Sequence, residues 1–139
     1  MSSTEKLSPG LKGAAELVVA GEHTAPRVGS GRVHVLATPV MINLIEAAAL
    51  AAIEHLLPQG YQSLGTRLDI RHFAATPVGM RVRADVEIEK VEGRSVTFRV
   101  SVADEKEPVG DGTHERMVVN VSRFDVRVKD KVAMVRGRA

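Results

Sequence analysis

One stretch of the sequence, residues 37–58, restricts what this chain can fold into more than any other. It reads ATPVMINLIEAAALAAIEHLLP and is apolar on nearly every side of a helix. Thr38 is a good N-cap, Pro39 suits the first turn, and Pro58 with Gly60 ends the run. We therefore predict a helix about 28 Å long, at about 1.5 Å per residue. Such a helix is buried on most of its surface.

One carboxylate, Glu46, lies in the middle of this predicted helix. Burying an unpaired acid is costly because desolvation disfavours its charged form. One interpretation is a general acid or base that catalysis requires at this position. The other is a carboxylate that pairs with an arginine or fills a gap in the packing. The position alone leaves both interpretations open.

After residue 60 the apolar pattern changes from helical to alternating. The alternation predicts strands at residues 64–73, 81–90, 96–102 and 109–121, with a further strand or a continuation at 124–128. A short strand is expected at 15–20, and Pro and Gly indicate a loop at 23–31. The predicted class is α+β, with an antiparallel meander wrapped around one long central helix. Because one sheet covers only one side of that helix, we expect a second subunit over the rest.

The length of 139 residues suits a single domain. We predict a flexible N-terminal arm at residues 1–12, one domain at 13–130 and a basic C-terminal tail at 131–139. The first residues lack the apolar segment of a signal peptide. Glu46 and Glu54 interrupt the long helix, which indicates a core helix and not a membrane span. We expect a cytoplasmic protein without a membrane partner.

Composition excludes several kinds of site. The absence of cysteine excludes disulfides, a thiolate nucleophile and cysteine-ligated zinc. A net charge of +2 and an aromatic content of 3% make a nucleic-acid partner unexpected. His114-Glu115 begins like a zinc-protease motif, but Val118 stands where the second histidine is required. Gly29-Ser30-Gly31 lacks the third glycine of a dinucleotide site, so we expect neither a metal nor a cofactor.

Two further residues could carry chemistry. Thr38 is either a plain N-cap or a hydroxyl that acts at the positive end of the helix. It lies eight residues before Glu46, roughly 12 Å along the axis, so the two cannot touch directly. His72 ends the stripe that Leu64, Thr66, Leu68 and Ile70 form on one strand face, and it should point toward the core. It is either a satisfied core histidine or an acid–base group.

Four segments resemble the fluoroacetyl-CoA thioesterase family of hot-dog-fold proteins over about residues 37–128. They read ATPVMINLIEAAA, SLGTRLDIRHFAATPVGM, VEGRSVTFRVSV and VGDGTHERMVVN. The resemblance implies a hot-dog fold, a homodimer with active sites near the interface, and hydrolysis of a small acyl-CoA. By motif match it implies catalytic roles for Thr38, Glu46 and His72. It also implies a backbone N–H donor to the thioester oxygen at Gly65 and an active-site arginine at Arg116.

The resemblance departs from the family's fluoroacetyl-specific enzyme in one place. That enzyme carries phenylalanines in a lid before the helix, whereas the stretch from His23 to Leu36 holds none and presents Arg32 and His34. The acyl group is therefore left open. Two other functions also stay open: a hydratase or dehydratase acting on acyl thioesters, and a non-catalytic module that binds acyl-CoA or another small ligand.

Overall fold

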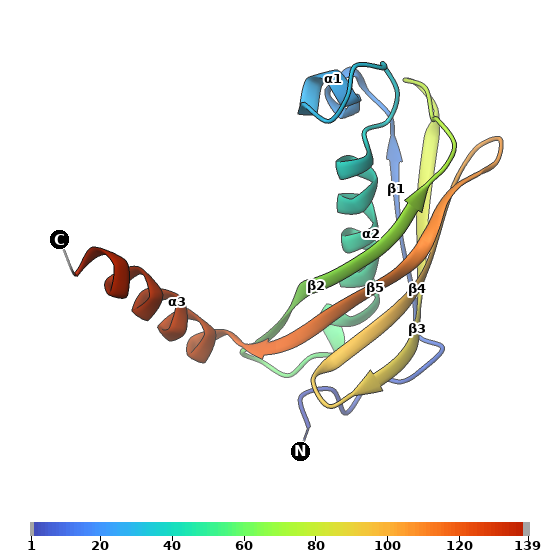
Figure 1. Cartoon of the computed structure of the whole chain (residues 1–139). Helices are drawn as coiled ribbons and strands as arrows, with labels where there is room; N and C mark the ends of the chain where they lie inside the picture. The colour runs from blue at the N-terminus through green and yellow to red at the C-terminus, as the bar shows by residue number, and fades with distance from the viewer. Residues whose placement is uncertain (1, 138–139) are drawn as a thin grey trace.

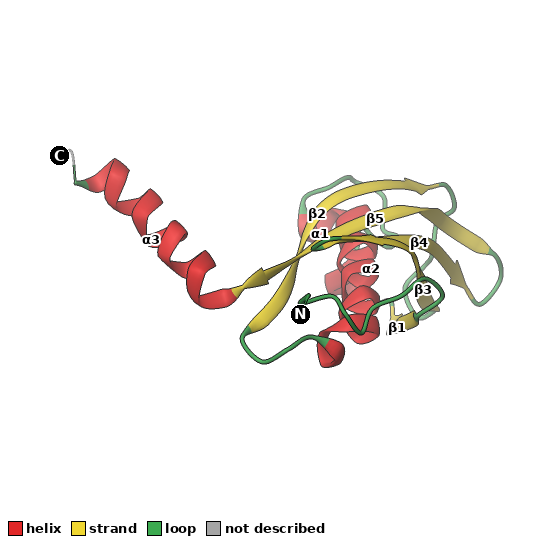
Figure 2. Cartoon of the chain, turned by 90° about the horizontal axis from the view of Figure 1, so that it is seen from below, coloured by secondary structure: helices red, strands yellow, loops and turns green. Residues whose placement is uncertain are grey.

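The structure, a computed structural model, describes residues 2–137 and shows one antiparallel sheet curled around a central helix (Figure 1). The strands are β1 (Lys12–Val18), β2 (Tyr61–His72), β3 (Arg81–Glu92), β4 (Ser95–Asp104) and β5 (Pro108–Asn120). The α-helices are α1 (Ala25–Val28), α2 (Thr38–Ile53) and α3 (Val121–Arg136), and the 3-10 turns are η1 (Gly21–His23) and η2 (Glu54–Leu56). Figure 2 shows the sheet arching over α2, while α3 leaves the domain.

The long apolar run forms α2 and its 3-10 extension η2, as predicted. The segment Thr38–Leu56 has a mean hydropathy of 1.4 and is long and apolar enough to cross a membrane, on length and composition alone. Its large side chains Met41, Ile45 and Ile53 are fully buried inside the domain. They pack with the inward side chains of the sheet, among them Val82 and Phe98. This packing is that of the core helix expected from the sequence.

The strand order is β1-β3-β4-β5-β2, and every neighbouring pair is antiparallel. Strands β3, β4 and β5 form the predicted meander. The prediction is wrong for β2, which crosses to the far side of the sheet and pairs with β5 instead of β3. As a result β1 and β2 are the two edges of the sheet. An edge strand exposes a row of backbone N–H and C=O groups that another chain can pair with.

A β-bulge divides β2 into two parts. The pairing with β5 shifts between Gly65 and Arg67, so Thr66 is the extra residue. The bulge reverses the side-chain alternation, because one added residue turns every later side chain to the other face. Leu64, opposite exposed Met117, therefore lies on the outer face, whereas Leu68, opposite buried His114, lies on the helix face. The single stripe predicted through residues 64–72 is wrong in its first half.

The two ends of the chain differ from the sequence prediction. Residues 2–11 lie against the domain: Thr4 Oγ1 donates to the carbonyl oxygen of Gly93 at 2.6 Å, and Leu7 is buried in the core. The strand predicted at 124–128 is wrong, since this segment is part of α3. Its apolar residues recur every three or four positions, which is the helical period: Val121, Phe124, Val128, Val132 and Val135. The Asn120 side chain caps this helix by accepting from the Arg123 N–H.

The approach of β1 to α2 generates a stability prediction. A Cβ on Gly13 would lie 2.7 Å from Ala52 Cβ and 2.8 Å from Ala52 N, and it would also meet the Ala48 carbonyl oxygen. Because helix backbone cannot move aside cheaply, we expect Gly13→Ala to lower the free energy of unfolding by about 1–3 kcal/mol. Urea unfolding followed by circular dichroism measures the change. Gly21→Ala is the control, since nothing lies within 4 Å of its Cβ; equal stability of both variants would contradict the prediction.

Candidate active site

The N-terminus of α2 and the end of β2 bring two of the predicted site residues together. Ala37 is the N-cap and Thr38 is the first helical residue, so the prediction of Thr38 as N-cap is wrong. The Thr38 side chain makes no capping hydrogen bond. Its Oγ1 lies instead 2.7 Å from Nδ1 of His72, the last residue of β2. A hydroxyl is thus held against a histidine at the positive end of a helix.

The environment of His72 favours its neutral form. Burial lowers the pKa of this imidazole below its ordinary value, because desolvation disfavours the charged ring. The other ring nitrogen, Nε2, is buried and has no hydrogen-bond partner among residues 2–137. An uncharged imidazole at neutral pH can accept a proton from the hydroxyl that it contacts.

Thr38 and His72 line a cavity of about 290 Å³. Its lining comes from residues 30–33, 35–36 and 72–75, with Ala25 and Thr38. The segment predicted as a loop at 23–31 contains the short helix α1, which begins with Ala25-Pro26 because proline is well tolerated in a first helical turn. Arg32 borders the cavity, as expected for the lid region, but His34 does not.

Glu46 belongs to a second cluster, in the middle of α2. Its Oε2 lies 3.3 Å from Nη1 of Arg116 on β5. The Glu46 side chain is 35% exposed, while the Arg116 side chain is only 5% exposed. The prediction of a deeply buried lone acid is therefore wrong, because Glu46 is paired with an arginine and partly exposed. Arg116 also donates through Nε to Ser63 Oγ at 2.8 Å and through Nη2 to the Ser63 carbonyl at 3.1 Å.

Gly65 lies directly against this ion pair. A Cβ at this position would be 2.6 Å from Glu46 Oε2, 3.2 Å from His114 Cε1 and 3.5 Å from Arg116 Nη1. Only glycine leaves room for the carboxylate at this point of β2. The structure thus brings Gly65, Glu46 and Arg116 together, but within one chain it keeps them apart from Thr38, which is roughly 12 Å away along the helix.

His114 is the residue of this cluster that the sequence prediction missed. Its Nδ1–H donates to the Arg67 carbonyl at 2.9 Å, so its Nε2 accepts from Arg116 Nη1 at 3.1 Å. The ring also stacks on Phe98, with centroids 6.1 Å apart. Burial, followed by the Arg116 charge, lowers the pKa of His114. Its two-residue spacing from Arg116 was the available signal, since residues i and i+2 of a strand share a face.

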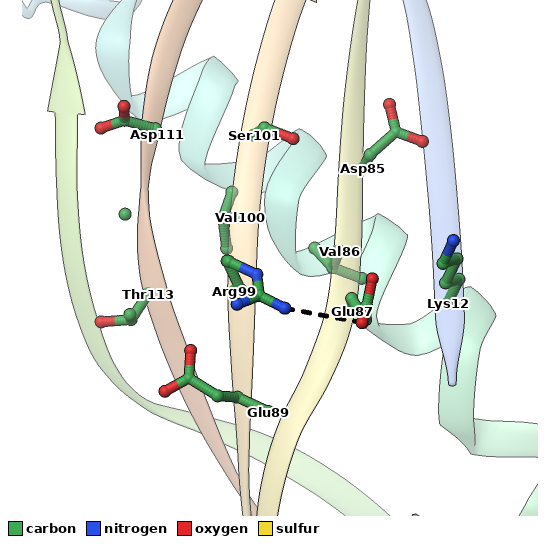
Figure 3. A pocket seen from close by; sticks show the side chains of 11 residues that line it. Lys12, Asp85, Val86, Glu87, Glu89, Arg99, Val100, Ser101, Asp111 and Thr113 are labelled. Atoms are coloured by element: carbon green, nitrogen blue, oxygen red, sulfur yellow. Dashed lines mark ion pairs between the residues drawn. The ribbon is translucent and has the colours of Figure 1, made fainter. Parts of the chain in front are cut away.

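A larger cavity, about 740 Å³, lies elsewhere, on the outer face of the sheet (Figure 3). Figure 3 shows its charged side chains in front of the strands, with α2 behind them. Several of them form ion pairs: Arg99 pairs with Glu87 of the same lining at 3.5 Å, and Asp85 pairs with Arg83 outside it at 3.1 Å. No predicted site residue borders it. Within residues 2–137, no group of three or more acidic or histidine side chains is placed to hold a metal ion.

An antiparallel sheet wrapped around one central helix, with polar clusters at the start and middle of that helix, is the arrangement of a hot-dog-fold protein. Solved structures agree with this class. A fluoroacetyl-CoA thioesterase structure superimposes with a TM-score of 0.85 at 34% identity, over 90% of this chain and 97% of that chain. A thioesterase superfamily member from Thermus thermophilus gives 0.83 at 30% identity, over 91% and 96%.

Sequence comparison narrows the class to a family. The profile of the fluoroacetyl-CoA-specific thioesterases matches residues 19–122. The curated fluoroacetyl-CoA thioesterase of Streptantibioticus cattleyicolor is 41% identical over 97 residues, which are 70% of each chain. The chain belongs to the fluoroacetyl-CoA-specific thioesterase family, as the sequence resemblance indicated. The family match ends at the start of α3.

The lowered pKa of His114 generates a pH prediction. Because the unfolded chain takes up this proton first as the pH falls, the stability that neutral His114 provides is lost below about pH 6.5. The slope is at most about 1.4 kcal/mol per pH unit for each such histidine. We expect His114→Gln, which can keep both hydrogen bonds, to reduce the loss measured by urea unfolding between pH 7 and 5. His55→Gln removes an exposed histidine as the control, and an unchanged slope in His114→Gln would contradict the prediction.

Proposed function

We propose that this chain hydrolyses short-chain acyl-CoA thioesters and that Thr38 and His72 carry out the reaction. The observation that carries the proposal is their 2.7 Å contact at the wall of a small cavity. A volume of about 290 Å³ is at the lower end for ligand sites and suits a small acyl group. Family membership supports the same chemistry, and a variant of the solved relative is described in complex with fluoroacetate and CoA.

The proposed reaction uses the hydroxyl as nucleophile. Thr38 Oγ1 attacks the thioester carbonyl while unprotonated His72 Nδ1 accepts its proton. The C–S bond breaks, and the CoA sulfur leaves with the proton that His72 returns. Water then attacks the acyl-threonine ester with His72 again as base, which releases the free acid and restores the hydroxyl. The N-terminus of α2 favours the negative charge that develops on the carbonyl oxygen.

We further propose a homodimer in which two β2 edges pair. The side of α2 turned away from the sheet carries small and apolar residues, Ala47, Leu50 and Ala51, that are exposed in the single chain. Leu68, on the helix face of the edge strand β2, is 39% exposed as well. Apolar surface next to an open strand edge fits a second copy of the chain. A cytoplasmic location without membrane or nucleic-acid partners stays a prediction.

In such a dimer each site draws on both protomers. We propose a register in which Gly65 of one β2 strand lies opposite His72 of the other, so that the partner's Gly65 and Glu46 approach Thr38 and His72. We propose that the partner's Gly65 N–H donates to the thioester oxygen and that the partner's Glu46, positioned by Arg116, orients the hydrolytic water. One oxyanion-hole donor contributes roughly 3 kcal/mol of transition-state stabilisation in acyl-transfer enzymes where it has been removed by mutation.

The residues that line the cavity limit which acyl groups the site is expected to accept. Arg32, Val33 and Phe73 border it, whereas no phenylalanine occurs between His23 and Leu36. Fluoroacetyl preference is therefore not part of the proposal. Small acyl groups such as acetyl and propionyl are the expected substrates, and chains too long for a cavity of about 290 Å³ should react slowly.

Removal of the Thr38 hydroxyl or the His72 imidazole should abolish most of the activity. Thr38→Val keeps the side-chain shape but removes the nucleophile, and His72→Ala removes the base, so we expect each to lower kcat/KM for acetyl-CoA by at least about 100-fold. Thiol release from a panel of acyl-CoAs measures the rates, and His55→Ala, an exposed histidine beyond α2, is the control. Hydration of crotonyl-CoA, or thermal stabilisation by acyl-CoA without turnover, would replace the thioesterase proposal by a hydratase or a binding module.

The assembly prediction uses two leucines of the same strand. Leu68 is on the helix face beside the exposed side of α2, and Leu64 is on the outer face, with exposed fractions of 39% and 41%. A charge at Leu68 would be buried between protomers, so we expect Leu68→Glu to sediment as a monomer and to lose activity. Leu64→Glu should remain dimeric. A monomeric wild-type protein, or the same mass for both variants, would refute this assembly.

A further inference from the structure

Three arginines surround a cavity of about 420 Å³ at the base of α3. Its lining consists of Arg94 from the β3–β4 turn, Arg123 and Arg127 from α3, with Asn120 and Val126. No carboxylate contributes to this lining. The cavity is therefore a concentration of positive charge between the sheet and the helix that extends from it.

These arginines differ from those on the strands. Each strand arginine pairs with a carboxylate within 4 Å: Arg67, Arg71, Arg81, Arg83, Arg99 and Arg116. Over the described part of the chain, none of Arg94, Arg123 and Arg127 takes part in an ion pair. Neighbouring cations repel one another, so a cluster without counter-charges fits a site for an external anion.

The guanidinium groups of these three arginines indicate that the bound anion is a phosphate. Guanidinium groups bind phosphate oxygens through paired, charge-assisted hydrogen bonds. The cavity also lies at the first turn of a 16-residue helix, whose N-terminal dipole favours negative charge. Several guanidiniums around one cavity fit an anion with more than one negative charge, such as a phosphomonoester or a diphosphate.

The position of the cluster indicates which phosphate. Asn120 pairs with Tyr61 at the start of β2, whereas Thr38 and His72 lie at its other end. Twelve residues of strand separate the two ends by about 40 Å, so this cluster cannot serve the cavity of its own chain. In the register proposed above, Gly65 of one protomer lies against His72 of its partner, so the start of β2, four residues before Gly65, lies about 13 Å beyond the partner's cavity. The arginines of one protomer then lie beyond the mouth of the partner's cavity, on the side where a bound CoA extends away from its thioester.

We propose that Arg94, Arg123 and Arg127 bind the phosphates of the CoA whose acyl group is hydrolysed in the partner's cavity. The inference rests on the proposed thioesterase and its dimer. Helix α3 lies beyond the matched family segment. In this proposal it recognises the CoA part of the substrate, not the acyl group. The pantetheine arm separates the phosphates from the thioester, which is the separation that two distinct subsites require.

Kinetics with and without the phosphates test the proposal. We expect Arg94→Gln and Arg127→Gln each to raise KM for acetyl-CoA about tenfold, because a charge-assisted hydrogen bond is lost. The preference for acetyl-CoA over S-acetylpantetheine, which has no phosphates, should fall by the same factor. Arg136→Gln removes the same charge farther along α3 and should behave as wild type. A KM like that of Arg136→Gln in both cavity variants would overturn the proposal.

Calorimetry with adenosine 3′,5′-bisphosphate separates this inference from the proposed function. We expect binding to the wild-type protein and to Arg136→Gln, and loss of binding in the Arg94→Gln/Arg127→Gln double variant with an unchanged circular dichroism spectrum. No binding to the wild type, or equal binding to all three proteins, would overturn the phosphate site. Bisphosphate binding by a protein that hydrolyses no acyl-CoA would instead support the site and reject the thioesterase.

Discussion

The close contact of α2 with the sheet determines where every site residue lies. At Gly13 the strand β1 comes so near to Ala48 and Ala52 that no side chain fits between them. Small residues on the helix and a glycine on the strand let the two backbones approach, and the larger residues Met41 and Ile45 fill the remaining core. With the helix fixed in this way, Thr38 meets the end of β2 and Glu46 meets its middle.

The arrangement of charges around Glu46 follows from that placement. Arg116 is almost wholly buried, and such a guanidinium needs counter-charge and hydrogen-bond acceptors from every side. Glu46, Ser63 and a neutral His114 supply them. The neutral histidine accepts where a charged one would repel, so the carboxylate is held in one orientation. The ion pair therefore fixes the position of the Glu46 carboxylate.

Much of the fold follows from local pattern, because burial enforces the 3.6-residue period of α2 and the two-residue period of β3 and β4. The sequence predictions fail where the structure depends on contacts between residues that are far apart in the chain. The bulge at Thr66 depends on pairing with β5, and β2 lies beside β5 because of a crossing that alternation does not encode. Alternation over residues 124–128 is too short to distinguish a strand from α3. Of the site residues, the contact of Thr38 with His72 and the role of His114 depend on tertiary packing, whereas Glu46 is conspicuous in the sequence itself.

The bulge in β2 also bears on how this chain avoids aggregation. A straight twelve-residue edge strand is a template on which further chains can add without limit. Thr66 interrupts that template, and the charged side chains of Arg67, Asp69 and Arg71 follow it on the exposed edge strand. An interrupted and charged edge does not offer a continuous ladder for fibre growth. The irregularity that displaces the side chains thus disfavours polymerisation through this edge.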